Sequence, residues 1–120
     1  MEIFREFTFE AAHHLPNTPA GHKCRRLHGH SFRFRVRLQG PVDPHAGWVA
    51  DFDEVEKACE PVRLELDHYC LNDIPGLENP TSENIARWLW RRLKSKLPEL
   101  AAIEIWETCT AGCVYRGEDD

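Results

Sequence analysis

The sequence has no long apolar run. No stretch approaches the ~18 apolar residues of a membrane span, and the charged start Met1–Glu6 lacks the apolar core of a signal peptide. Positive charge is also in deficit, because 15 basic residues stand against 20 acidic ones for a net charge of -5. Nucleic-acid binding usually needs the opposite balance. These absences predict a cytoplasmic protein that binds neither membranes nor nucleic acid.

Internal repeats, low-complexity tracts and long Pro/Gly/Ser linkers are absent too. Residues 1–120 are therefore expected to form a single domain. The chain has 5 cysteines, an odd number that does not suit a complete disulfide framework. In a reducing cytosol each of them is interpreted as a thiol, a metal ligand or a nucleophile.

Two segments alternate with the two-residue period of a half-buried strand. Residues 3–13 do so imperfectly, since Arg5 interrupts the apolar positions, whereas 28–38 alternate cleanly. In the second segment one face carries the histidines and apolar residues, and the other carries Arg33, Arg35 and Arg37. The phenylalanines are expected to face away from these arginines, which counts against an RNA-binding sheet.

Two helices are predicted between these strands and the C-terminus. Asp51 is a capping residue, and apolar residues recur at helical spacing from Phe52 to Leu66, with a kink or interruption expected at Pro61. Thr81 or Ser82 caps a second amphipathic helix, which is expected to end at Pro98. Alternation then resumes over 103–109 and over 113–116.

The predicted order is strand, strand, helix, helix, strand, strand. This ββααββ order indicates an α+β fold, a four-stranded antiparallel sheet with two helices on one face. Such a sheet leaves two unpaired edges and an uncovered arginine face. Oligomerisation that closes several sheets into a β-barrel would remove both problems.

The sharpest local signal is His28-Gly29-His30. In a strand, residues two apart point to the same face, so both imidazoles can reach one metal ion. His13, at the end of the first strand, supplies a third nitrogen if the two strands are neighbours. Three histidines with an open fourth position are typical of catalytic zinc. The alternative is that one or two of them are ordinary core or surface histidines.

Cys24 precedes His28 by four residues and has two open interpretations. It is either the fourth ligand of a closed structural zinc site or a free base or nucleophile beside the metal. Lys23, Arg25 and Arg26 flank it, and positive charge favours both a thiolate and a phosphate-bearing substrate. A solvated basic loop is the alternative.

Three other candidates are weaker. Asp67 and His68 would form an acid-base couple, although adjacent side chains rarely face the same way, so a surface loop is the alternative. Glu107 falls on the buried face of the third predicted strand, where it pairs either with a planar ligand carrying two N–H donors or with an arginine. Cys109 and Cys113 are either packing residues or a metal or redox pair.

Taken together, five motifs resemble the tetrahydropterin synthase family over about residues 3–116. They are Phe9–His13, Cys24-(x3)-His28-Gly29-His30, Leu66–His68, Pro80–Asn84 and Glu107-Thr108. The Cys-x3-His-Gly-His spacing and the stretch from Glu107 to Cys113 look closest to the bacterial 6-carboxytetrahydropterin synthases of queuosine biosynthesis.

The resemblance implies a tunnelling fold whose subunits assemble into a trimer-based homo-oligomer, with a hexamer as the larger form, and active sites between subunits. It implies that the three histidines hold Zn²⁺, that Cys24 is the proton-abstracting base, and that Asp67 and His68 complete a relay from a neighbouring subunit. It also implies that Glu107 anchors a pterin, with Thr81 and Ser82 nearby. Our own hypothesis adds Arg26 as a triphosphate contact.

The implied reaction converts 7,8-dihydroneopterin triphosphate to 6-carboxytetrahydropterin, acetaldehyde and triphosphate. A 6-pyruvoyl-tetrahydropterin synthase, which retains the side-chain carbons, is the alternative within the family. A folate-pathway relative is disfavoured, because that branch has glutamate in place of the cysteine base. From another class, a binding module with a closed site made by Cys24 and the three histidines stays open.

Overall fold

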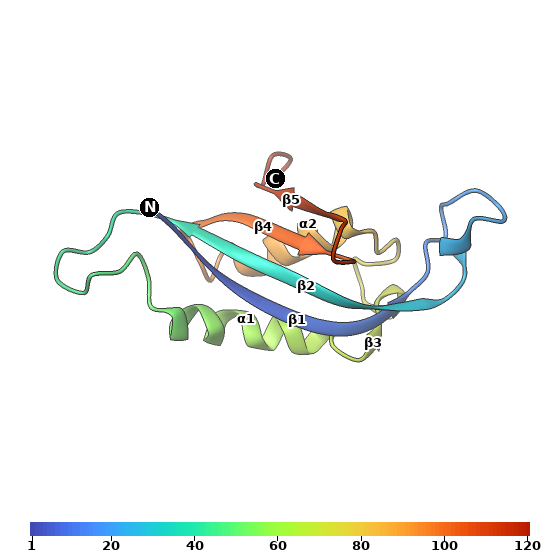
Figure 1. Cartoon of the computed structure of the whole chain (residues 1–120), viewed down its shortest axis with the longest axis horizontal. Coiled ribbons are helices and arrows are strands. Elements are labelled where there is room, and N and C mark those ends of the chain that lie inside the picture. The colour runs from blue at the N-terminus through green and yellow to red at the C-terminus, as the bar shows by residue number, and fades with distance from the viewer.

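A computed structural model describes all 120 residues of the chain. Helices α1 (Phe52–Leu66) and α2 (Ser82–Leu93) cover one face of a five-stranded sheet whose order is β3-β1-β2-β4-β5 (Figure 1). The strands are β1 (Glu2–His13), β2 (His28–Gln39), β3 (Tyr69–Cys70), β4 (Leu100–Trp106) and β5 (Gly112–Tyr115), and the short 3-10 helices η1 (Lys23–Arg25) and η2 (Leu71–Asp73) lie in loops. The two-layer α+β prediction is confirmed.

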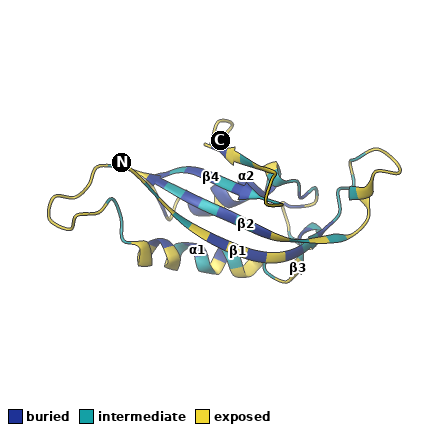
Figure 2. Cartoon of the chain, in the orientation of Figure 1, coloured by how far each residue is buried: buried dark blue, intermediate teal, exposed yellow.

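The core lies between the sheet and the helices. From Phe7 in β1 and from Phe32 in β2, buried residues alternate with exposed ones in β1 and mostly with half-buried ones in β2 (Figure 2), because successive side chains of a strand point to opposite faces. Phe7 stacks on Phe34 and Phe9 on Phe32 across the strand pair, with ring centroids 5.1 and 4.9 Å apart. These two aromatic pairs bury the centre of the hairpin and fix its register.

The predicted strand count was wrong by one. Strand β3 spans two residues, too few for any alternation to appear in the sequence, and it pairs in parallel with β1 through Ala11↔Tyr69 and Ala12↔Cys70. The sheet remains open, with β3 and β5 as its outer strands.

Helix α1 runs through Pro61 without an interruption, which was one of the two effects expected there. Asp51 caps its start by accepting from the Asp53 amide at 2.9 Å, as predicted. Cys59 and Val62, on either side of the proline, are fully buried. Burial of this apolar stripe against the sheet compensates for the one backbone hydrogen bond that proline cannot donate.

Helix α2 begins as predicted and ends earlier. The Thr81 hydroxyl accepts from the Asn84 amide at 3.2 Å, so Thr81 is the cap. The helix stops at Leu93 rather than at Pro98, and Leu97 is nevertheless buried in the turn that follows. None of the helices has the length and apolar character that crossing a membrane requires.

The arginine face is free of helices, as expected, but it is not free of aromatic rings. Phe7, Phe9, Phe32 and Phe34 do face the core, whereas Phe4 and Trp106 lie among the arginines. The Arg35 guanidinium carbon is 4.4 Å from the Phe4 ring centroid and 5.0 Å from that of Trp106. The expectation that stacking and charge do not converge was therefore wrong. Glu6 and Glu104 pair with these arginines, so the face carries mixed charge.

Candidate functional site

Three histidines meet at the end of the β1/β2 hairpin. His13 lies directly opposite His28, and Ala11 opposite His30, in the register that the phenylalanine pairs fix. The imidazole centroids are 4.6 Å apart for His13 and His28, 5.1 Å for His13 and His30, and 4.8 Å for His28 and His30. The structure brings these three side chains together, and their role as ligands of one metal ion stays a prediction.

Backbone carbonyls orient two of the rings. His13 Nδ1 donates to the Pro80 carbonyl at 2.9 Å, and His28 Nδ1 donates to the Arg26 carbonyl at 2.7 Å. Because a carbonyl oxygen only accepts, each Nδ1 must carry the proton, which leaves Nε2 with its lone pair in the neutral ring. Burial lowers the pKa of His13 and favours that neutral form. Hydrogen bonds of this kind commonly orient metal-binding histidines.

Two of the ring nitrogens in this cluster have no hydrogen-bond partner in the protein. Nε2 of His13 and Nε2 of His30 are both buried and make no hydrogen bond. Glu107 Oε1 lies 3.1 Å from the first of these nitrogens and 3.5 Å from the second. An ionised carboxylate also only accepts, so Glu107 Oε1 and the Nε2 lone pair of the neutral His13 ring repel one another unless a cation lies between them.

His13, His28, His30 and Glu107 thus form a group that can hold a metal ion. One ligand atom from each lies within 4.8 Å of the others. Three imidazole nitrogens and a carboxylate oxygen suit a divalent transition metal. Cys24 is not part of this group, so the fourth position of a closed site would fall to Glu107 instead.

Glu107 differs from its prediction in one respect. Strand β4 ends at Trp106 rather than at Cys109, so Glu107 lies just beyond the ladder, and its side chain is 28% exposed rather than fully buried. No arginine pairs with it; the titratable side chains beside it are those of His13 and His30. The β4–β5 turn holds it there, since the Glu107 amide donates to the Ala111 carbonyl at 3.2 Å.

A cavity of about 520 Å³ adjoins the metal-binding group. Its walls are Lys23, Cys24, Arg26, Leu27, His28, His30, Glu107 and Thr108. Cys24, half-buried and free, therefore shares the cavity with two of the three histidines. The basic residues beside it separate into two kinds. Lys23 and Arg26 line the cavity, whereas Arg25 is bound elsewhere, donating to the Thr18 carbonyl at 2.8 Å.

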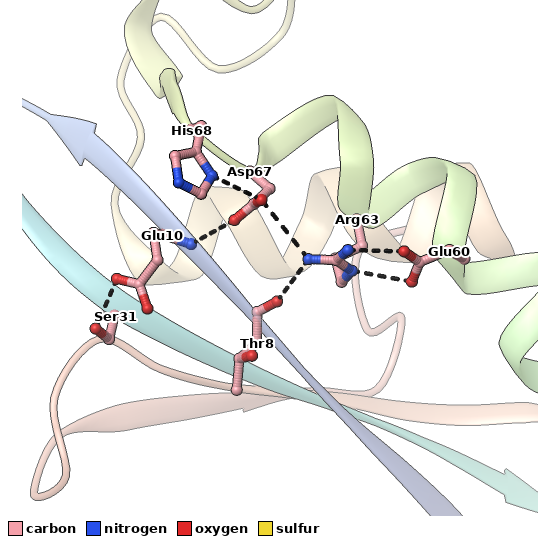
Figure 3. A network of polar contacts seen from close by, with 7 residues as sticks. All are labelled: Thr8, Glu10, Ser31, Glu60, Arg63, Asp67 and His68. Carbon is pink, nitrogen blue, oxygen red and sulfur yellow. Dashed lines mark hydrogen bonds and ion pairs between the residues drawn. The ribbon is translucent and has the colours of Figure 1, made fainter.

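Asp67 and His68 contact each other directly, contrary to expectation. His68 Nδ1 lies 2.7 Å from Asp67 Oδ2 (Figure 3). His68 has a φ of 65°, the left-handed conformation, and this turn brings two adjacent side chains to the same side. The His68 side chain is 78% exposed, and neither residue lines the cavity. Within one subunit they form a couple that is separate from Cys24.

Thr81 and Ser82 also lie outside the cavity walls, and the Thr81 hydroxyl is occupied in capping α2. Sequence reasoning missed the carbonyls of Pro80 and Arg26, because a backbone acceptor leaves no signal in residue type. It also missed Leu27 and Thr108 as cavity walls. Cys109 and Cys113 are free thiols and do not belong to a metal-binding group.

A histidine cluster that can hold a metal ion, beside a free cysteine in a small cavity, is an arrangement suited to an enzyme that acts on a small molecule. A family model described as 6-pyruvoyl tetrahydropterin synthase matches residues 2–118. The chain therefore belongs to the 6-pyruvoyl tetrahydropterin synthase family and is an enzyme of the tetrahydropterin synthase type.

Individual relatives agree with this assignment. The chain is 46% identical to the 6-carboxy-5,6,7,8-tetrahydropterin synthase of Synechocystis sp., over 94% of this chain and 91% of that protein. It is 37% identical to the dihydroneopterin monophosphate aldolase of Pyrococcus furiosus, over 88% of each chain. The solved structure of Caenorhabditis elegans 6-pyruvoyl tetrahydropterin synthase superposes with a TM-score of 0.91 at 30% identity, covering 98% of this chain and 96% of that one. The tunnelling fold is thereby confirmed.

Proposed function

We propose that the chain is a zinc-dependent 6-carboxy-5,6,7,8-tetrahydropterin synthase of queuosine biosynthesis. Its substrate would be 7,8-dihydroneopterin triphosphate, which with one water gives 6-carboxytetrahydropterin, acetaldehyde and triphosphate. The observation that carries the proposal is the free Cys24 in one cavity with His28 and His30. The 46% identity to a relative of that name supports the choice of product within the family.

His13, His28 and His30 would hold the zinc ion, which when bound would stabilise negative charge on a side-chain oxygen of the substrate. Cys24 would remove a side-chain proton as a thiolate. Glu107 would anchor the pterin, because a carboxylate accepts two parallel N–H donors. The contact of Glu107 with His13 also permits a ligand role, and the two roles are separable by experiment.

Asp67 and His68 would act in the active site of a neighbouring subunit. Within one subunit their couple does not line the cavity, and the imidazole is 78% exposed, which is the exposure that action across an interface requires. The oligomer would form through the open edges β3 and β5. Thr81 and Ser82 are proposed as weaker pterin contacts across the same interface, and Arg26 as a triphosphate contact.

The test is to incubate zinc-loaded protein with 7,8-dihydroneopterin triphosphate and to identify the products by mass spectrometry. We expect 6-carboxytetrahydropterin and acetaldehyde. Accumulation of 6-pyruvoyltetrahydropterin would favour the other synthase of the family, whose C. elegans member has the same fold. Dihydroneopterin monophosphate, named in the Pyrococcus relative, is the comparison substrate.

The Cys24→Ala variant separates the enzyme from a zinc-stabilised binding module. In the enzyme, the variant loses turnover and keeps its zinc, because Cys24 lies outside the metal-binding group. In the module, where Cys24 would be the fourth ligand, the variant loses zinc and thermal stability together.

A further inference from the structure

The Asp67–His68 couple is attached to the rest of the domain on two sides. On the first side, the peptide of Glu10 in β1 holds both residues: its N–H donates to Asp67 Oδ1 at 2.8 Å, and its carbonyl accepts from the His68 amide at 2.6 Å. On the second side lies Arg63, one turn earlier in α1, whose Nη1 is 3.8 Å from Asp67 Oδ2 (Figure 3). The second contact is an ion pair rather than a hydrogen bond.

Arg63 is itself fixed in place by two partners. Its Nε and Nη2 donate to the two carboxylate oxygens of Glu60 at 2.9 and 2.7 Å, a two-point contact between planar groups. Its Nη1 donates to the Thr8 carbonyl at 3.2 Å. The Arg63 side chain is only 23% exposed, although it belongs to a surface helix. A long flexible side chain is thereby held in one position, with its charge beside Asp67.

The ionised Asp67 carboxylate determines which ring nitrogen of His68 carries the proton. The Glu10 amide, the His68 ring and, more weakly, the Arg63 guanidinium hold the pKa of Asp67 below its usual value. An ionised carboxylate only accepts, so His68 Nδ1 must carry a proton, and Nε2 of the neutral exposed ring is left free to take one. The direction of the imidazole is set at the same time, because Nδ1 points at Asp67 Oδ2.

We propose that Arg63, held by Glu60, is a positioning residue for the Asp67–His68 couple. Arg63, whose Nη1 lies 3.8 Å from Asp67 Oδ2, keeps the carboxylate turned toward His68 and so favours the imidazole tautomer that presents Nε2 to a partner site. Its relevance to turnover rests on the proposed function, in which His68 relays a proton. Its effect on the tautomer does not depend on that function.

Helix α1 offers a matched control. Glu54 and Lys57 form a second ion pair with the same spacing of three residues, at 3.1 Å, and its side chains are 66% and 74% exposed. Neither of them contacts Asp67 or His68. Lys57→Gln therefore removes an ion pair from the same helix without changing the couple, and Arg63→Gln removes one that adjoins it.

The first measurement is the imidazole ¹H–¹⁵N spectrum of the zinc-loaded full chain, with the His68 signals identified by their loss in His68→Ala. In the wild type and in Lys57→Gln we expect protonated Nδ1 and unprotonated Nε2 on the neutral ring. In Arg63→Gln we expect a mixture of both tautomers, and in Glu60→Gln a smaller change in the same direction. An unchanged His68 spectrum in Arg63→Gln, with its fold intact by circular dichroism, would overturn the proposal.

The second measurement is steady-state turnover. We expect Arg63→Gln to lower kcat about tenfold, the effect typical of residues that orient a reacting group, with KM and zinc content unchanged. Arg63→Lys keeps the positive charge but cannot make the two-point contact with Glu60. Its kcat should therefore lie between those of the wild type and Arg63→Gln. A wild-type protein without turnover would refute the proposed function. The effect of Arg63 on the His68 tautomer would then be tested by the imidazole spectrum alone. An equal loss in Lys57→Gln would mean that helix stability, not positioning, is responsible.

Discussion

His13 Nδ1 donates a 2.9 Å hydrogen bond to the carbonyl of Pro80, a residue 67 positions further along the chain. This bond connects the end of β1 to the residue that precedes the cap of α2. It fixes the proton on Nδ1 and turns the Nε2 lone pair toward His30 and Glu107. The metal-binding group therefore depends on the packing of α2 as well as on the β hairpin.

Substitution of His13 should remove the metal without removing the fold. We expect His13→Ala to bind zinc more than about 100-fold less tightly, since even residues that only orient a ligand contribute up to that factor. Zinc at about 100 times its Kd should raise the wild-type free energy of unfolding by about 2.7 kcal/mol, and chelation should reverse this. The variant should show no such increment.

Its control is His14→Ala, which alters the next residue. His14 is held through its backbone amide and carbonyl to Asn72, and its ring is not part of the metal-binding group. The control should keep the zinc-dependent increment. Measuring the increment by urea unfolding, rather than total stability, separates metal loss from the cavity that His13→Ala leaves. A variant that keeps the full increment would contradict the ligand assignment.

Glu107→Gln distinguishes anchoring of the pterin from metal binding. If the carboxylate anchors the pterin, zinc content should stay near one per chain, and kcat/KM should fall at least about 100-fold, or about 2.7 kcal/mol of transition-state stabilisation. Exposed Glu99 provides the control substitution, which should change neither quantity. Loss of zinc together with activity would show instead that Glu107 is a metal ligand.

Cys59 should make the fold sensitive to alkaline pH. Burial raises the pKa of its thiol from 9.0 to about 12. Between these values the unfolded chain has released the thiol proton while the folded chain keeps it. The free energy of unfolding is therefore highest, as far as this thiol is concerned, below pH 9, and it falls as the pH rises above 9. The loss from this thiol is about 1.4 kcal/mol at pH 10.

The Cys59→Ala variant checks this sign. It starts less stable because it leaves a small cavity, but its stability should fall less steeply between pH 8 and pH 10.5 in urea titrations. The exposed thiol of Cys109 is the matched control, and Cys109→Ala should keep the wild-type slope. Equal slopes in Cys59→Ala and the wild type would mean that the thiol ionises as freely in the folded chain as in the unfolded one.

The open sheet edge leads to a prediction about assembly. Val114 in β5 is 45% exposed, on the outer strand of the sheet. A charge on an edge strand opposes pairing with another chain, so Val114→Lys should shift the protein from oligomer toward monomer. Light scattering at micromolar concentration measures this. Val42→Lys, at a loop valine that is 42% exposed, should leave the oligomer unchanged. A monomeric wild type would refute the oligomer.

Charge reversal separates two neighbouring arginines. Arg26 lines the cavity and pairs with no carboxylate, whereas Arg25 is bound to Thr18. If Arg26 contacts the triphosphate, Arg26→Glu should raise KM at least about tenfold, equivalent to about 1.4 kcal/mol of lost binding. Arg25→Glu should change KM much less. An unchanged KM in Arg26→Glu would exclude that contact.

Local periodicity accounts for most of the fold that the sequence predicted. The two-residue alternation gave β1 and β2 to within one residue at each end, and the caps at Asp51 and Thr81 gave the helix starts. These features are local, because burial of one face selects residues at a fixed spacing. Strand β3 escaped prediction, and the sequence left open whether Pro61 would kink or interrupt its helix, since each depends on packing against β1 or the core.

The candidate site also combines features that local sequence predicts with features that only tertiary contacts produce. His28 and His30 share a face because of strand geometry alone, and His13 followed from the pairing of consecutive strands. Only tertiary structure brought Glu107 to His13, separated Arg26 from Arg25, and placed Asp67 in contact with His68 and beside Arg63. The sequence by itself thus determined which chemical groups are available. The tertiary structure decided which of them meet, because such contacts join residues far apart in the chain or depend on a backbone turn that residue type does not reveal.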